Sequence, residues 1–171
     1  QLVQPLCEQI RPRLRLIALR QRANLAFQHL DQMQALRRFD RPDHRVYSAP
    51  IISLADPAKA VEEVEYVLGA GAKLVCVRPA PVPGAVRPRS LGDPIHDPVW
   101  ARLAEAGIPV VFHLSDSGYM AVPALWGGSG VFRGFGKRDP LDMVIMDDRA
   151  IHDTMAAMIV HQVFTRHPKL K

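Results

Sequence analysis

Between residues 46 and 113, short apolar runs alternate with stretches of helical periodicity. The runs at Val46–Leu54 and Lys73–Arg78 are rich in β-prone residues, and a third run, Ile108–His113, ends on a histidine. The stretches between them repeat apolar residues three and four positions apart, which is typical of a helix with one buried face. This order of strand, helix, strand, helix and strand predicts a parallel sheet with right-handed crossovers.

Capping residues and glycines mark the ends of the two helices between these strands. Asp56-Pro57 is typical of a helix start, and Gly69 predicts the end of that helix. Asp97-Pro98 repeats the cap-and-proline start, and Gly107 ends the second helix. The proline-rich segment 79–92 between the helices is predicted to be a long, semi-rigid loop.

Two further helices are predicted outside this region. From about Arg13 to Phe39 the apolar residues form the stripe of an amphipathic helix. A final helix over about Asp148 to Thr165 is expected to bury Met155, Met158, Ile159 and Phe164. The regular pattern loosens over Gly118 to Gly136, and Gly127–Gly130 within it predicts a turn or a flexible lid. We therefore expect a basic helical segment, 1–45, followed by an α/β domain, 46–171.

Composition fits one domain, and charge distinguishes the first segment. The 171 residues are 48% hydrophobic, enough for a core, and contain neither a membrane-spanning apolar run nor a signal-peptide core, which predicts a cytoplasmic protein. The net charge is +5, and residues 1–50 hold nine arginines but four acidic residues. Aromatic residues for base stacking are not interleaved there, which favours a solvated helix face over nucleic-acid binding. Cys7 and Cys76 show neither metal-site nor disulfide spacing and are predicted to be buried thiols.

Candidate chemistry lies at the carboxyl ends of the second and third predicted strands. Ligands of parallel α/β sheets bind at this edge. Arg78 and His113 end these consecutive strands and are expected at the same crevice. There a guanidinium can hold a carboxylate, and an imidazole can bind a metal or transfer protons. The alternative is that His113 is an ordinary strand-end histidine hydrogen-bonded to the backbone.

Other motifs do not match a known catalytic or metal-binding pattern. The segment His113–Ser117 contains a serine and an aspartate but lacks the G-x-S-x-G elbow of a nucleophilic serine. Gly127–Gly130 is followed by no Gly-Lys-Ser/Thr and is not a phosphate loop. His152 and His161 lie nine residues apart and are predicted on a helix surface or at an interface. No H-x-H, H-E-x-x-H or C-x-x-C occurs, so the sequence shows no self-contained zinc site.

Three segments together resemble the amidohydrolase-related family that includes aminocarboxymuconate semialdehyde decarboxylase: Ser48–Pro57, Asp97–His113 and Val163–Leu170. The likeness covers residues 46–171, whereas residues 1–45 match the family poorly. It implies a (β/α)8 TIM barrel with a divalent metal, often zinc, at the carboxyl ends of the strands. By this resemblance His113 is a metal ligand, while Arg78 and Asp116 are expected to bind substrate and the catalytic residue is not identified. The resemblance implies a hydrolase or decarboxylase acting on a small carboxylate.

The predicted strands are too few to complete such a barrel. About three parallel strands with flanking helices leave open sheet edges. We therefore expect a partial barrel that is either a piece of a longer enzyme or a chain that associates into a homo-oligomer. Alone it is expected to bind metal weakly and to be inactive. The alternative is a non-catalytic α/β scaffold, or degenerate paralogue, that oligomerises through its first and last helices.

Overall fold

The computed structural model of the chain describes residues 46–84, 87–113, 118–119, 121–129, 140–146 and 148–171. The backbone divides into two compact units, Gln1–Ser48 and Ala49–Lys171. Cys7, Asp116 and the helix predicted over 13–39 lie outside the described residues.

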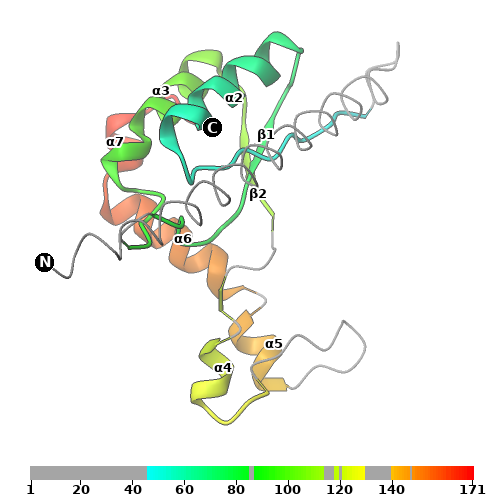
Figure 1. Cartoon of the computed structure of the whole chain (residues 1–171), viewed down its shortest axis with the longest axis vertical. Helices are drawn as coiled ribbons and strands as arrows, with labels where there is room; N and C mark the ends of the chain where they lie inside the picture. Colours follow the sequence, from blue (N-terminus) through cyan, green and yellow to red (C-terminus); the bar gives the residue numbers. More distant parts are fainter. Residues whose placement is uncertain (1–45, 85–86, 114–117, 120, 130–139, 147) are drawn as a thin grey trace, which may run out of the picture. The chain divides into compact units, whose positions relative to one another are not determined.

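Two short strands form a parallel sheet, as predicted (Figure 1). Strand β1 (Val75–Val77) pairs with β2 (Val110–Phe112), and Val77 lies opposite Phe112. Of the strand predicted over 46–54, only Ile51 pairs, in a parallel bridge to Cys76 of β1. The strand predicted over 46–54 is therefore reduced to a single bridge. On the other side of β2, the Val110 N–H donates to the Lys171 carbonyl at 2.8 Å.

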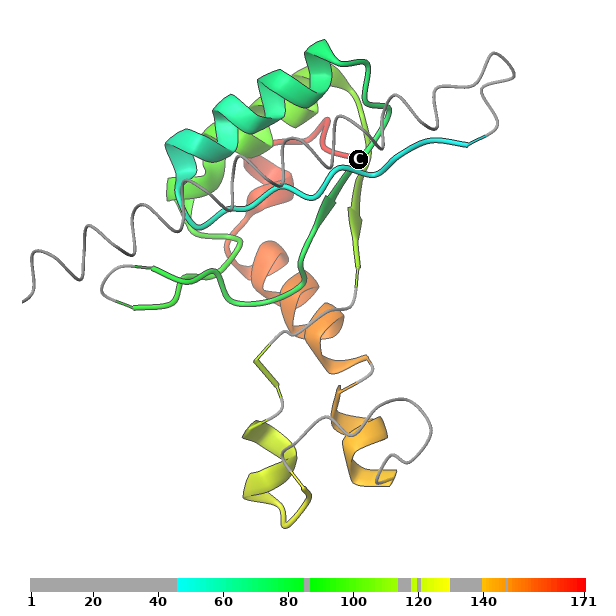
Figure 2. The same ribbon diagram turned by 45° about the vertical axis from the view of Figure 1, so that its right-hand side comes forward.

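The two predicted crossover helices are present and lie side by side (Figure 2). Helix α2 (Pro57–Gly69) begins as predicted: the Asp56 carboxylate accepts from the backbone N–H groups of Ala58 and Lys59 at 3.1 and 3.2 Å. Helix α3 (Asp97–Ala106) follows a single 3-10 turn, η1 (Pro94–His96), and ends at Gly107 in the left-handed conformation.

The predicted capping role of Asp97 was wrong. This residue is the first residue of α3, preceded by His96 in the capping position, which makes no side-chain cap. The Asp97 carboxylate instead pairs with Arg166 near the end of the chain. A long-range guanidinium partner has replaced the local backbone N–H groups that the dipeptide pattern suggested.

The core lies between the two helices and the sheet. Five of its fully buried residues are Val64 and Val67 of α2, Val75 of β1, and Trp100 and Leu103 of α3. The Trp100 indole donates to the Leu91 carbonyl at 3.0 Å, which satisfies its buried N–H. Each such aliphatic side chain contributes about 1.5–3 kcal/mol on burial.

Among the described residues after β2 there are four helices: α4 (Ala121–Leu125), α5 (Pro140–Met146), α6 (Arg149–Val160) and α7 (Val163–Arg166). The segment predicted to be irregular thus contains α4, and the predicted final helix is two helices. Gln162 has a φ of +59°, which ends the helical path between them. Met158 is buried as expected and Met155 is only half-buried, whereas Ile159 and Phe164 are exposed. The predicted burial of these two residues was wrong: Phe164 lies beyond the break at Gln162, and Ile159 lies off the face of α6 that buries Ala150, Thr154 and Met158.

Candidate functional site

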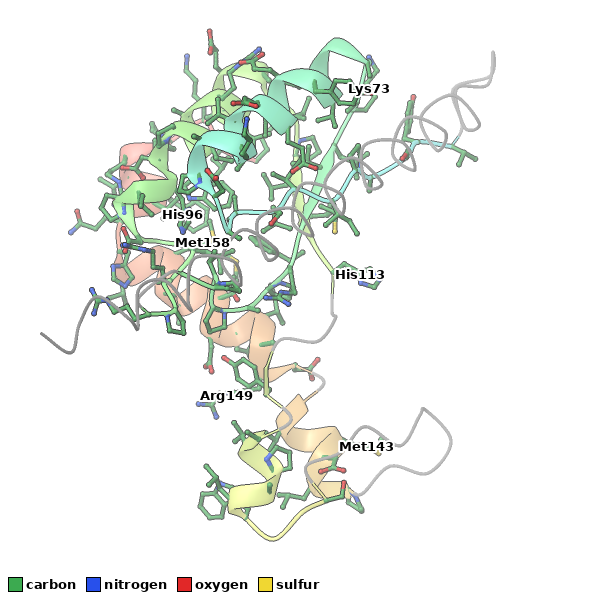
Figure 3. All side chains as sticks on the ribbon, viewed as in Figure 1. Lys73, His96, His113, Met143, Arg149 and Met158 are labelled. Carbon is green, nitrogen blue, oxygen red and sulfur yellow. The ribbon has the colours of Figure 1, made fainter. Side chains whose placement is uncertain are left out.

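Arg78 and His113 immediately follow the two paired strands. The register that sets Val77 opposite Phe112 brings the next residues, Arg78 and His113, to the same end of the sheet. The His113 N–H donates to the Val77 carbonyl at 3.3 Å, which ties the two strand ends together. Figure 3 shows His113 at the carboxyl end of β2. The expected proximity of these two strand ends is therefore present in the backbone.

Both residues also belong to one face of the sheet. Successive side chains of a strand point to opposite faces. Val75 and Val77 are buried, whereas Ile51 is 59% exposed and Val111 is 37% exposed. Counting by two from Val111 reaches His113, and both residues are exposed. Cys76 pairs with both Ile51 and Val111, so its side chain belongs to their face of the sheet. Arg78 lies two positions after Cys76, on the same face, and is exposed. Arg78 and His113 thus lie at the carboxyl edge of the more exposed face.

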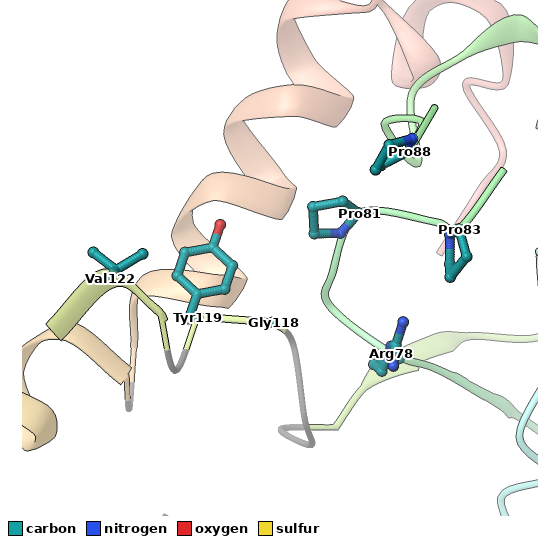
Figure 4. A pocket seen from close by; sticks show the side chains of 7 residues that line it. All are labelled: Arg78, Pro81, Pro83, Pro88, Gly118, Tyr119 and Val122. Atoms are coloured by element: carbon teal, nitrogen blue, oxygen red, sulfur yellow. The ribbon is translucent and has the colours of Figure 1, made fainter. Parts of the chain in front are cut away.

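A pocket of about 430 Å³ lies beside Arg78 (Figure 4). Its lining consists of one cation, one aromatic ring and otherwise small or apolar groups: Arg78, Pro81, Pro83, Pro88, Gly118, Tyr119 and Val122. The proline loop is closed by a backbone bridge in which Val82 and Arg89 exchange two hydrogen bonds of 2.8 Å. The size is in the range of small-molecule sites, about 300–1,000 Å³. His113 is not among the lining residues, so the structure brings Arg78 but not His113 to this pocket.

A second, smaller cavity of about 260 Å³ adjoins the first. The two cavities share Pro81, Pro88 and Tyr119 as lining residues. The remaining lining of the smaller one mixes apolar and polar groups: Ala80, Arg89, Ser90, Leu91, Asp153, Thr154 and Ala157. The shared residues therefore form the wall between the two spaces.

Tyr119 is held in this wall from α6. Its hydroxyl donates to Asp153 Oδ2 at 2.7 Å, and the Arg149 Nε lies 2.9 Å from each Asp153 oxygen. Burial raises the pKa of Tyr119 to about 12, helped by the hydrogen bond to Asp153 and its negative charge. Burial alone would raise the pKa of Asp153, but the hydrogen bonds from Tyr119 and Arg149 outweigh it and lower that pKa.

Sequence reasoning missed this cluster. Arg149 and Asp153 are four residues apart on one helix, and that spacing alone could have predicted their pairing. No local pattern links them to Tyr119, which lies 34 residues before Asp153.

The described residues do not form a metal centre. In that part of the chain no group of three or more His, Cys, Asp or Glu side chains could hold a metal ion. A catalytic zinc usually takes three protein ligands. His113 offers one imidazole, His152 and His161 are exposed along α6 and its end, and Asp116 lies outside the described residues. The residues that the structure describes therefore do not fit a divalent metal by themselves.

Cys76 is buried and not in a disulfide. Burial raises the pKa of its thiol, while a hydrogen bond from the His113 backbone lowers it by less. A buried thiol with a raised pKa is a poor nucleophile. The structure thus supports the predicted structural role of Cys76.

A parallel sheet with helical crossovers and polar groups at its carboxyl edge defines an α/β protein whose fold fits part of a (β/α)8 barrel. The sequence profile of the amidohydrolase family matches residues 12–171. The chain therefore belongs to the amidohydrolase family, which confirms the resemblance found in its sequence. The profile match begins well before residue 46, where the sequence motifs of that resemblance start.

A solved structure supports the same assignment. The crystal structure of an amidohydrolase from Mycobacterium avium subsp. paratuberculosis K-10 is similar, with 72% sequence identity and a TM-score of 0.68. The similarity covers 78% of this chain and 32% of that chain, so this chain spans about a third of the length of that relative. No curated protein matches. Among the described helices, none has the length and apolar character needed to cross a membrane.

Proposed function

We propose that this chain forms part of a metal-dependent hydrolase or decarboxylase, and that Arg78 binds the carboxylate of a small substrate. The observation that carries the proposal is the placement of Arg78 and His113 at the ends of paired parallel strands, on one face of the sheet. In (β/α)8 enzymes the reacting groups lie at this edge. Membership of the amidohydrolase family supports a hydrolase-type reaction.

Arg78 is suited to the substrate role that we assign to it. Its guanidinium is exposed beside the pocket of about 430 Å³, and a guanidinium can donate two parallel hydrogen bonds to one carboxylate. The apolar walls of the pocket would receive the rest of a small organic acid. We propose Asp116 as a second substrate contact, since it follows His113 closely in the chain.

His113 is proposed as one ligand of a divalent metal, with zinc the leading candidate. An exposed imidazole at a strand end suits that role. The described residues provide too few donors to complete the site. The complete site would take its other ligands from residues outside the described part or from a partner chain. It follows that the chain alone should bind metal weakly and show no turnover.

Metal titration tests the role of His113. The purified chain and its His113→Ala variant are titrated with Zn²⁺ in a calorimeter, with His152→Ala as the matched control because His152 is exposed on α6. Weak binding that is lost in His113→Ala and kept in His152→Ala would support the proposal. Equal binding by all three proteins would show that His113 is not a ligand. Rapid turnover by the isolated chain would contradict the proposal that its metal site is incomplete.

A non-catalytic scaffold is the second candidate function. Ile159, Val160 and Phe164 are exposed at the end of α6 and in α7, and Val160 is 76% exposed. Such a patch suits association with another chain. Light scattering would show a defined oligomer that forms without metal if this function holds, and a monomer in metal-free buffer would count against it.

A further inference from the structure

The two adjoining cavities differ in what they could hold, and Tyr119 stands between them. The larger space beside Arg78 has a size that suits a small ligand, whereas the smaller one, about 260 Å³, falls below that range. Figure 4 shows the Tyr119 ring between Val122 and the loop that carries Pro81 and Pro88. A ligand that entered from the Arg78 side would therefore meet the ring before it reached the smaller space.

Pro81 and Pro88, which line both cavities together with Tyr119, are restricted in conformation by their own rings. Proline fixes its φ near −65°, so Pro81 and Pro88 lose little freedom when a ligand binds. The bridge between Val82 and Arg89 closes the loop that carries them. Tyr119 is different because its ring can rotate about its side-chain bonds, and its position depends on the bond from its hydroxyl to Asp153.

We propose that Tyr119 is a partition that limits the length of the anionic ligand admitted beside Arg78, and that Asp153 is the positioning residue that holds this partition closed. Asp153 acts through Tyr119, and Arg149 orients the Asp153 carboxylate from one helical turn away. The inference rests on the proposed function only in taking the pocket beside Arg78 as a ligand site. Nothing in it requires a metal or a chemical step.

The chemistry of the walls defines the ligand class. One guanidinium faces a space otherwise bounded by proline rings, an aromatic ring and Val122. A carboxylate joined to a compact apolar body satisfies both features. A second ring added to that body would have to pass Tyr119 to reach the space lined by Leu91, Ala157 and Thr154.

Two matched probes test the partition: benzoate and biphenyl-4-carboxylate, which differ by one ring. Their dissociation constants are measured by calorimetry on the full chain. We expect the wild-type chain to bind benzoate at least as well as the longer acid. Tyr119→Ala should favour biphenyl-4-carboxylate by about tenfold in the ratio of the two constants, since the added ring gains an apolar contact.

Conservative variants distinguish the effect of where the Tyr119 ring is held from the effect of its volume. Tyr119→Phe keeps the ring and removes the hydroxyl, whereas Asp153→Ala removes the acceptor. Each should shift the ratio in the same direction as Tyr119→Ala but by less, and the double variant should shift it no further than either single change. A general loss of stability would give additive effects instead. Tyr66→Phe, a tyrosine of α2 outside both cavities, should leave the ratio unchanged.

The outcomes of these measurements distinguish failure of the partition from failure of the proposed role of Arg78. An unchanged ratio in Tyr119→Ala and Tyr119→Phe would overturn the partition, as would a wild-type chain that binds neither probe. If Arg78→Ala keeps full affinity for benzoate while Tyr119→Ala still changes the ratio, the substrate role of Arg78 fails and the partition stands. Loss of benzoate binding in Arg78→Ala together with the ratio change would support both.

Discussion

The guanidinium of Arg166 in α7 forms two hydrogen bonds with the carboxylate of Asp97, the first residue of α3. Nε lies 2.8 Å from Oδ2 and Nη2 lies 2.7 Å from Oδ1. The same Nη2 donates to the Gly92 carbonyl at 3.2 Å, and His167 Nε2 lies 3.2 Å from Asp97 Oδ1. The side chains of Asp97 and Arg166 are 26% and 29% exposed, so water screens this pair only in part. The contact fastens the last helix to the start of α3.

Replacing Asp97 by alanine should therefore lower the free energy of unfolding by about 1–3 kcal/mol, because a charged hydrogen-bonded group loses its partner. Urea denaturation would measure the loss. Glu62→Ala is the control: Glu62 is 64% exposed in its pair with Lys59, and such surface pairs contribute about 0–1 kcal/mol. Equal effects of the two variants would contradict the structural role of the Asp97–Arg166 pair.

The same pair should contribute to acid sensitivity. Burial would raise the pKa of Asp97, but the hydrogen bonds from Arg166 and the nearby His167 ring outweigh it and hold that pKa below 3.8. A carboxyl with a lowered pKa in the folded state stabilises the protein above its unfolded pKa and loses that contribution as the pH falls through its folded value. Asp97→Ala should thus differ less from the wild-type chain below pH 3.8 than at neutral pH.

Gly92 marks a close approach between the proline loop and the end of α6. A Cβ atom at this position would lie 2.6 Å from His161 Cβ and 2.9 Å from the Ala157 carbonyl oxygen. Gly92→Ala should therefore destabilise the fold by about 1–3 kcal/mol through overpacking. Thermal denaturation would show the loss as a lower midpoint.

Gly69 provides the matched control for this substitution. It is the last residue of α2, and a Cβ there meets nothing within 4 Å. Gly69→Ala should be neutral or stabilise by up to about 1 kcal/mol, since alanine loses less backbone entropy in a helix. A Gly92→Ala variant as stable as Gly69→Ala would show that the loop and α6 are not in this contact.

Local pattern predicted the parts of the fold that local chemistry determines. Asp56 caps α2 because the backbone N–H groups that donate to its carboxylate follow it closely in sequence. The apolar periods around Val64 and Leu103 predicted the two crossover helices. The parallel strands and the placement of Arg78 and His113 at their ends followed from the same alternation.

Contacts between distant segments were not predictable in this way. Asp97 has the same dipeptide context as Asp56, yet its partner is Arg166, 69 residues later. Tyr119 meets Asp153 across a segment with no sequence period. The break at Gln162 depends on a positive φ that an unbranched polar residue can adopt and that the apolar pattern does not reveal. The candidate pocket thus depends on long-range packing, while its one strand-end residue, Arg78, could be predicted from the sequence.

Tyr119 should ionise only in strongly alkaline solution. Burial and the neighbouring Asp153 raise its pKa from 10 to about 12. Because the folded-state pKa is raised, the hydrogen bond stabilises the protein fully below pH 10 and is lost as the pH rises through about 12. Phenolate absorbance during alkaline titration would follow this step. Asp153→Ala should move the step to lower pH, and Tyr66→Phe should leave it in place.

His96 is 1% exposed and neither ring nitrogen has a hydrogen-bond partner among the described residues. Burial is the main cause of the lowered pKa of His96, although Asp93 and Asp97 favour the charged form and Arg89 opposes it. A base with a lowered pKa in the folded state stabilises the protein above its unfolded value, 6.5, and that contribution falls as the unfolded chain takes up a proton below this pH. The wild-type chain should therefore lose stability in mild acid.

His96→Leu should match or exceed the stability of the wild-type chain at pH 7.5, because an unpaired buried polar ring is replaced by an apolar side chain. At pH 5.5 the advantage should grow, since the unfolded wild-type chain takes up a proton on His96 below pH 6.5 that the folded chain binds less readily. Urea denaturation at the two pH values measures both differences. His152→Leu, at an exposed position on α6, should keep the wild-type pH dependence. If His96→Leu keeps it too, the acid sensitivity arises elsewhere, and His96 has a polar partner that lowers the cost of its burial.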